Sequence, residues 1–482
     1  MPVFPADEGY GKFPFPLLNW LHIDTKDIVL MRLLPFSPGD EISDSLINEY
    51  IMQGKRNLSN TSFISDAEIY RIDTTKNGLI ITYQTWEMWS TKPAADLSYV
   101  AGQLEYSVEL EEENLLGLGT CIEFSYGKQI DDYHEKLKID IPPVLPEKYK
   151  FYMLWDKSVR MEKYDISLRR PSMTNYEKVL SGLTIRKNDG EFDHWVNGDS
   201  IDGSYNKDET TASFDLLHRL DNNLFVESSI GYLDKKSTFK EESRRHLSRR
   251  FILGMRYFKR SYECTDYIDC FTREEEIQKG YNLSLALDVD PFAKEDNIKI
   301  DASLGTVNTL GDYFLSLTAS SEWSFYKRTN RIDLSLVSPK FLNTRIINSY
   351  TYKSIINGDI DDYYYEGSDN RLRGYSVHEL VGEEYFAANI ESRFFTNIEF
   401  FSIRPSIVLF FDSANFGKMD SFDDYHFGAG GGLRLSSTKA STIMRFEIAT
   451  AIGKGSPEPK YIVVSRLPFS GILGIEDFIG SL

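Results

Sequence analysis

The chain has 482 residues, a formal charge of −19, and aromatic residues that are mostly Tyr and Phe (29 and 31, against 6 Trp). The excess of acidic residues argues against a nucleic-acid role, which would require a basic face. No apolar run approaches about 18 residues, so the sequence predicts no transmembrane helix. Aromatic, glycine and polar residues alternate through most of the chain, which is typical of a soluble β protein or of a membrane-spanning barrel.

The first residues do not have the pattern of a secretory leader. Met1-Pro2-Val3-Phe4-Pro5 has neither a positively charged start nor an apolar stretch. If the protein is exported, we expect this sequence to be a mature form, or its start to be misplaced. Residues 1–19 are interpreted as an N-terminal extension.

Residues 20–92 predict a small α/β unit. Ile28 to Leu34 is an apolar run typical of a strand, and residues 35–40 contain the proline and glycine of a turn. Ser43 can cap a helix with one apolar face, and a second, shorter helical stretch surrounds residues 58–64.

A hairpin completes this unit. Residues 67–72 and 79–85 read as two strands, with Lys76-Asn77-Gly78 as the turn between them. The expected order is therefore β-α-α-β-β, one sheet with two helices on a face. A linker is expected at residues 93–96.

From residue 97 to 469 the chain alternates apolar and polar residues in segments of strand length. The clearest examples are residues 103–110, 281–289, 331–336 and 444–449. A soluble sandwich would show the same alternation, but this segment is too long for a single sandwich. The sequence therefore predicts a mostly β fold with a large antiparallel barrel.

Three connections and three cysteines bear on this barrel. Glu111 to Gly119 is expected to form a hairpin turn, and the acidic segments 187–202 and 235–242 are expected to be solvated surface connections. Cys121 lies in a strand pattern and is expected to pack as a small apolar residue. Cys264 and Cys270 flank a polar loop and could close a small disulfide in an oxidising compartment. Metal binding by this pair is disfavoured, because no second pair or histidines follow.

Charged residues gather on the inward faces of the last predicted strands. Glu391 lies in one strand and Asp412 in the next, and inward carboxylates are costly unless they are paired. Arg373, in the loop sequence Leu372-Arg373-Gly374-Tyr375, offers fixed donors that suit a carboxylate. Glycines at residues 428–432 would leave room for this loop inside the barrel.

The chain resembles the BamA/TamA outer-membrane assembly and translocation superfamily, also called the bacterial surface antigen family. Residues 20–92 are similar to its periplasmic POTRA domain, with a generic α/β module as the alternative. The segments that carry the resemblance are, in chain order, Phe36-Ser37-Pro38-Gly39-Asp40, Arg56-Asn57-Leu58, Phe63-Ile64-Ser65-Asp66-Ala67, Glu87-x-Trp89, Asn114-Leu115-Leu116-Gly117-Leu118-Gly119 and Leu372-Arg373-Gly374-Tyr375.

The resemblance covers about residues 20–469 and implies a 16-stranded barrel in the bacterial outer membrane, with the POTRA domain in the periplasm. It also implies that Leu372, Arg373, Gly374 and Tyr375 enter the lumen on the loop between strands 11 and 12. There Arg373 would act as a lock on the barrel wall, with Glu391 and Asp412 as its partners. The last strand is expected at residues 461–469. Residues 470–482 then form a C-terminal tail, which departs from the family pattern.

We expect no catalytic residue, cofactor or metal. The chain has no G-x-S-x-G sequence and no phosphate-binding loop, and His378-Glu379 is not followed by the second histidine of a zinc helix.

The function that the resemblance implies is assembly or translocation of proteins, or of lipidic cargo, at the outer membrane. The implied partners are the lipid bilayer, unfolded or secreted proteins taken up at the POTRA sheet edge by strand addition, and accessory lipoproteins. The alternatives are a dedicated two-partner-secretion-type transporter for one cargo, a passive porin-like channel, and a soluble all-β binding protein.

Overall fold

The structure is a computed structural model of the whole chain. It describes residues 15–76, 78–100, 103–129, 132–171, 173, 177–197, 200–221, 223–240, 242–265, 275–293, 298–358, 362–367, 371–376, 379–398, 403–417, 425–437, 443–453 and 460–464. Across these residues, none of the helices has the length and apolar character needed to cross a membrane.

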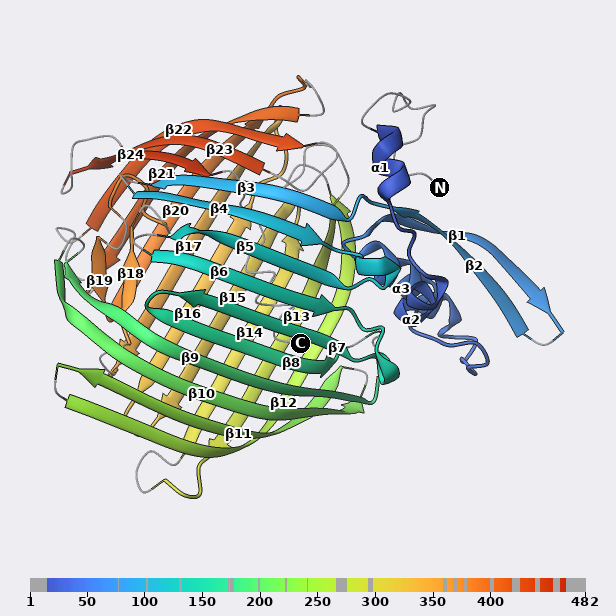
Figure 1. Cartoon of the computed structure of the whole chain (residues 1–482), viewed down its shortest axis with the longest axis horizontal. Helices are drawn as coiled ribbons and strands as arrows, with labels where there is room; N and C mark the ends of the chain where they lie inside the picture. Colours follow the sequence, from blue (N-terminus) through green and yellow to red (C-terminus); the bar gives the residue numbers. More distant parts are fainter. Residues whose placement is uncertain are drawn as a thin grey trace.

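In its described residues, the N-terminal unit has three helices and one hairpin (Figure 1). Its elements are α1 (Phe15–Leu21), α2 (Asp27–Leu33), α3 (Ile47–Ser59), β1 (Ile64–Thr75) and β2 (Gly78–Glu87). The predicted hairpin is confirmed, because β1 pairs antiparallel with β2 from Ile64 opposite Glu87 to Thr75 opposite Gly78. The expected N-terminal extension ends in α1.

The strand predicted at Ile28 to Leu34 is wrong, because this segment is helix α2. Val29 and Leu33 are buried four positions apart, whereas Ile28 and Met31 are exposed, which is the periodicity of one helix face. The helix ends just before Pro35, because a residue that precedes proline disfavours helical backbone. The expected β-α-α-β-β order is therefore α-α-α-β-β in the part of the unit that the structure describes.

The second helix expected around residues 58–64 is also wrong. Residues up to Ser59 belong to α3, and Ile64 already begins β1. Leu58, in the last turn of α3, packs into a small core that also contains Phe63 and Ile64. Packing against this core, rather than local sequence, decides where the helix ends and the strand begins.

The rest of the described chain is one closed antiparallel barrel of twenty strands (Figure 1). The strands of the ring, in chain order, are β3 (Thr91–Val100), β4 (Gln103–Glu112), β5 (Cys121–Gln129), β6 (Asp132–Ile141), β7 (Lys150–Ser158), β8 (Met161–Arg170), β9 (Val179–Asn197), β10 (Ser200–Asp221), β11 (Leu224–Phe239), β12 (Glu242–Thr265), β13 (Glu275–Val289), β14 (Ile298–Leu310), β15 (Tyr313–Ser324), β16 (Arg328–Val337), β17 (Thr344–Ile356), β20 (Glu384–Phe395), β21 (Ile403–Phe416), β22 (Tyr425–Ser437), β23 (Ile443–Ile452) and β24 (Lys460–Val464).

The last strand meets the first at a short junction. Within the described residues, β24 pairs with β3 at three positions: Ile462 with Val100, Val463 with Tyr99, and Val464 with Ser98. Neighbouring strands elsewhere in the ring pair over longer stretches; β21 and β22, for instance, pair from Ile403 opposite Ser437 to Asn415 opposite Tyr425. The remainder of the last strand expected at residues 461–469, and the tail at 470–482, lie outside the described residues.

Two expectations about the barrel need correction. The ring has more strands than the 16 implied by the resemblance, because very short connections, such as the two residues between β14 and β15, leave more of the chain for strands. The linker expected at residues 93–96 lies inside β3, where Ala95 pairs with Val108 of β4. The run of Pro and Ala there weakens the strand pattern in the sequence, and pairing with β4 overrides it.

The acidic segments expected to be surface connections are largely strand. Residues 187–197 extend β9, and residues 235–239 extend β11. Charges on these strands pair with charges on neighbouring segments: Arg160 Nη1 lies 2.9 Å from Asp193 Oδ2, and Arg245 Nη2 lies 2.8 Å from Asp234 Oδ2. Such pairs let a polar sequence continue as strand beyond the apolar part of the barrel.

The alternation predicted from the sequence is the inside-outside alternation of the barrel. On β21, Ile407 and Leu409 face outward with 48% and 63% of their surface exposed, whereas Ser406, Val408 and Phe410 face inward and are buried. Large apolar residues are also exposed on many other strands of the ring. The outside of the barrel is therefore apolar, and charged side chains lie inside.

The N-terminal unit is docked against the end of the barrel where β3 begins. Arg32 donates to the Val144 carbonyl at 2.6 Å, and Asn57 Nδ2 donates to the Met173 carbonyl at 3.3 Å. Val144, in the turn between β6 and β7, also packs into the apolar core of the unit beside Leu33. These contacts hold the unit against the turns of the barrel.

Candidate functional site

The predicted motif lies on the connection between β17 and β20, which are the fifteenth and sixteenth strands of the ring, and not between strands 11 and 12 as the resemblance implied. Because strands alternate in direction around the ring, this connection starts from the end of the barrel opposite the N-terminal unit. Two short strands, β18 (Tyr364–Glu366) and β19 (Leu380–Gly382), pair with each other on it. Between them, Leu372 to Tyr375 reach the inward faces of β20 to β23. We call residues 371–376 the lumen loop.

The side chain of Arg373 is enclosed by carboxylates of the wall. Its Nε and Nη2 atoms donate to the two oxygens of Asp412, each at 2.8 Å, and its backbone nitrogen donates to Asp412 Oδ2 at 3.2 Å. Nη1 donates to Glu391 Oε2 at 3.1 Å. The guanidinium also lies over the Phe410 ring, 3.4 Å from its centroid. The structure thus brings Arg373, Glu391 and Asp412 together, with the two-pronged geometry that makes an arginine–carboxylate pair strong.

Glu447 on β23 also belongs to this cluster, although sequence reasoning did not select it. Its carboxylate accepts from Arg373 Nη1 at 3.2 Å, from Arg434 Nη2 at 2.9 Å and from Arg445 Nη2 at 2.6 Å. The alternation of Arg445, Glu447 and Ala449 with apolar neighbours was the available signal. The strand pairing that places Glu447 opposite Gly432, and so beside the loop, was not readable from the sequence.

Glu391 is likewise shared between several arginines. It accepts from Arg393 Nε at 2.5 Å and from Arg434 Nη2 at 2.8 Å, in addition to Arg373. Among the described residues, we define the wall cluster as four guanidinium groups and three carboxylates: Arg373, Arg393, Arg434, Arg445, Glu391, Asp412 and Glu447. Because these groups are nearly all buried, removal of a single partner leaves charge without compensation, which is far more costly than loss of a surface pair.

Two glycines allow the lumen loop to approach the wall. The Arg373 carbonyl oxygen would lie 1.9 Å from a Cβ atom at position 428, so only glycine fits there on β22. Gly374 has φ of +101°, and a Cβ atom on it would lie 2.6 Å from the Thr450 carbonyl carbon on β23. Both contacts are between backbones, and any side chain at either position would push the loop away from the wall.

The remaining motif residues seat the loop by apolar packing. Leu372 and Tyr375 are fully buried in a cluster with Tyr385, Ala387 and Ala414 on β20 and β21. The Tyr375 hydroxyl donates to the Phe427 carbonyl at 3.2 Å. The lumen loop is thus held by a charged contact on one side and an apolar contact on the other.

The described residues test only part of the cysteine predictions. Cys270 and the side chain of Cys264 lie outside the described residues, so the possible disulfide between them stays a prediction. Cys121 begins β5 and is a free thiol, and its Sγ lies 3.4 Å from Glu111 Oε1. His378 also lies outside the described residues.

No family model and no curated protein matches this sequence. Several solved structures are similar in shape. BamA from Haemophilus ducreyi lacking POTRA domains 1–3 is 14% identical with a TM-score of 0.47, and the match covers 92% of this chain and 82% of that one. CdiB from Acinetobacter baumannii is 12% identical with a TM-score of 0.47, covering 93% and 73%. CdiB from Escherichia coli is 11% identical with a TM-score of 0.44, covering 92% and 74%. At these values, function has to be argued from the residues of this chain.

Proposed function

We propose that this protein is a bacterial outer-membrane β-barrel that assembles or translocates proteins. The observation that carries the proposal is the lumen loop, which the charged wall cluster grips inside a barrel whose outer surface is apolar. A passive pore has no need for an arginine that is buried among carboxylates of its own wall. A barrel that must be held in one conformation, and later leave it, does need such a contact.

A membrane location is supported by the outer surface. Val108 on β4, Leu253 on β12, Leu285 on β13 and Leu409 on β21 each expose more than half of their surface. A soluble protein seldom exposes so much apolar area, because contiguous apolar patches promote association in water. A lipid bilayer is the solvent in which an apolar outside and a charged inside are both favourable. Since closed barrels that span membranes are typical of bacterial outer membranes, we place the protein there, with its N-terminal unit in the periplasm.

The role proposed for Arg373 is that of a lock. Its bidentate contact with Asp412 and its contacts with Glu391 and Glu447 join the loop to strands β20, β21 and β23. While these contacts hold, that side of the barrel is rigid. A change of shape would then be confined to other parts of the ring, and the short junction between β24 and β3 is the natural place for it.

The N-terminal hairpin is the proposed point of substrate capture. Within the described residues, β1 pairs with β2 alone, so the outer edge of each strand retains backbone groups that can pair with another chain. An extended polypeptide can add to such an edge by main-chain hydrogen bonds. We therefore propose that unfolded or secreted proteins bind there, with accessory lipoproteins as further partners.

The experiment that tests this function is depletion of the protein in its host, followed by quantitative profiling of the outer-membrane and secreted fractions. A broad fall in barrel proteins would support a general assembly factor. Loss of one or a few surface or secreted proteins would support a dedicated transporter and would identify its cargo.

An unchanged profile, together with ion conductance of the purified protein in planar bilayers, would instead support a porin. Recovery of the intact protein in the aqueous phase without detergent would support a soluble binding protein and end the membrane proposal.

A further inference from the structure

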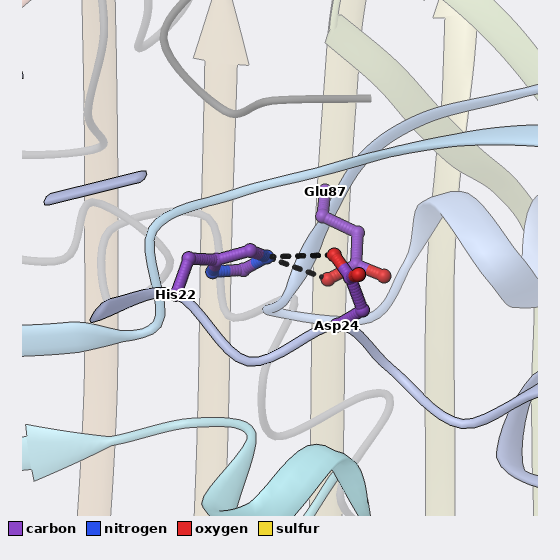
Figure 2. A group of neighbouring side chains, drawn as sticks. All are labelled: His22, Asp24 and Glu87. Carbon is purple, nitrogen blue, oxygen red and sulfur yellow. Dashed lines mark hydrogen bonds and ion pairs between the residues drawn. The ribbon is translucent and has the colours of Figure 1, made fainter. Parts of the chain in front are cut away.

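Three side chains that can bind a metal converge where the N-terminal segment meets the barrel. His22 and Asp24 lie on the connection between α1 and α2, and Glu87 is the last residue of β2, just before the chain enters β3. Figure 2 shows the imidazole of His22 pointing toward the two carboxylates. One ligand atom from each residue lies within 4.8 Å of the others.

The separations of these atoms suit a small ion. His22 Nε2 lies 2.8 Å from Glu87 Oε2 and 3.9 Å from Asp24 Oδ1. Two ligands of a tetrahedral zinc ion, each about 2.1 Å from the metal, are about 3.4 Å apart. The observed distances fall on either side of that value, so binding would require shifts of about half an ångström. The Asp24 side chain is 88% exposed and can make such a shift freely.

The backbone around the three residues is already fixed. The Thr25 nitrogen donates to Glu87 Oε1 at 2.9 Å, and the Lys26 nitrogen donates to the Gly117 carbonyl at 3.0 Å. The Asp24 carbonyl oxygen would lie 2.4 Å from a Cβ atom at position 117, so glycine is required there for this close approach. These contacts hold the Glu87 carboxylate and the backbone of residues 24–26 in place without a metal, and such preorganisation reduces the entropy lost on binding.

The charges and the histidine both point to a cation. Two carboxylates, those of Asp24 and Glu87, face the imidazole of His22 from separate segments of the chain. The His22 side chain is 95% buried, and among the described residues its Nδ1 has no hydrogen-bond partner. The polar contacts of the ring are therefore confined to Nε2, which faces two carboxylates.

We propose that His22, Asp24 and Glu87 form a binding site for a divalent transition-metal ion of the zinc class. One imidazole nitrogen and two carboxylate oxygens are a donor set that favours zinc over magnesium or calcium, which prefer oxygen ligands alone. Three protein ligands leave a fourth position for water. The ion would join the segment before α2 to the end of β2, just before the chain enters the barrel. It would so fasten the N-terminal unit where it meets the barrel. This site is independent of the proposed function.

The test is titration of zinc chloride into the purified full-length protein in detergent, after treatment with a chelator and its removal. Isothermal calorimetry should give one zinc ion per chain. Asp24→Asn should weaken the affinity at least about tenfold, because it removes a charged ligand at an exposed position without disturbing the fold. His22→Gln, which keeps a donor to Glu87, should do the same. Asp27→Asn, an exposed acidic residue three positions away, is the matched control and should bind zinc as the wild type does.

A second readout separates binding from misfolding. Zinc should raise the unfolding temperature of the wild type and of Asp27→Asn, and should not raise that of Asp24→Asn. The proposal is overturned if the wild type does not bind zinc, or if Asp24→Asn and His22→Gln bind it as tightly as the wild type. It is also overturned if magnesium or calcium at the same concentration binds equally well.

Discussion

Strands β20 to β23 and the junction between β24 and β3 are neighbouring parts of one ring, but they are held together differently. Adjacent strands of the first group pair over most of their length, and the lumen loop adds contacts that cross three of them. The junction has three paired positions within the described residues.

This difference indicates where the barrel can change shape at least cost. Opening the ring anywhere in β20 to β23 would break a long ladder of hydrogen bonds and separate buried charges that compensate one another. Opening it at the junction would break a short ladder. Among the described residues, the lumen loop thus strengthens the wall beside the shortest ladder of the ring.

The largest effect on the stability of the barrel is expected from Arg373→Ala. The change leaves Asp412, Glu391 and Glu447 without a guanidinium that contacts all three, and breaking a buried pair of this kind costs about 3–5 kcal/mol. We expect a lower unfolding temperature of the barrel in detergent, measured by heat-dependent mobility on gels, and impaired function in the depletion assay. Arg371→Ala, in the same loop but 3.8 Å from its acidic partner Asp333, is the control and should have little effect. Normal heat stability and activity in Arg373→Ala would contradict the lock.

A covalent link across the junction should abolish function without lowering stability. Tyr99→Cys and Val463→Cys, at directly opposed positions of β3 and β24, would be combined in a chain whose three natural cysteines are replaced by serine. Under oxidising conditions we expect substrate assembly or export to stop, and a reductant to restore it. A link between Val108 and Tyr126, opposed on β4 and β5, is the control. If the oxidised junction variant works normally, movement at this junction is not required.

A smaller effect is expected from Gly428→Ala. The added methyl group would overlap the Arg373 carbonyl, so either the loop or β22 must move, and overpacking of this kind costs about 1–3 kcal/mol. The unfolding temperature should fall, and protease should cut the connection between β17 and β20 more readily. Gly231→Ala on β11, where the nearest atom is an ordinary 3.6 Å away, should change neither quantity. Equal behaviour of the two variants would mean that the loop does not rest on Gly428.

The smallest effect is expected from Asn389→Ala on β20. Its amide donates to the Arg371 carbonyl at 2.5 Å and to Asp412 Oδ1 at 2.9 Å, and loss of such bonds costs about 1–2 kcal/mol. The expected result is a modest fall in unfolding temperature with function retained, measured as for Arg373→Ala. Ser392→Ala, on the opposite face of the same strand, serves as the control. A fall as large as that of Arg373→Ala would show that the amide, not the ion pair, holds the loop.

The sequence predicted the structure best in the barrel strands. There one face meets an apolar environment, so apolar and polar residues alternate with a period of two. The alternation along β21 and β23 predicted the strands and their inward faces, because a one-residue shift would place charges outside. Arg373, Glu391 and Asp412 could be selected because inward charges must be compensated and because the family resemblance implies this pairing. The part played by Glu447 could not be predicted, since it depends on which strand lies opposite Gly432.

The N-terminal unit was less predictable for a physical reason. Residues 28–34 are mostly apolar, and a short apolar run is compatible with a buried strand and with a helix that has one buried face. Val29 and Leu33 pack into a core that Val144, in a turn of the barrel, completes. This packing selects the helix. Tertiary contacts of this kind leave no periodic signal in the sequence.

The position of the lumen loop in the chain has a consequence for the order of folding. Arg373 precedes all four of the wall residues that hold it: Glu391 on β20, Asp412 on β21, Gly428 on β22 and Glu447 on β23 follow it in sequence. The complete set of contacts can therefore form only after four later strands have come together. Seating of the loop is a late event, and a fully seated loop is a sign that this side of the barrel has been built.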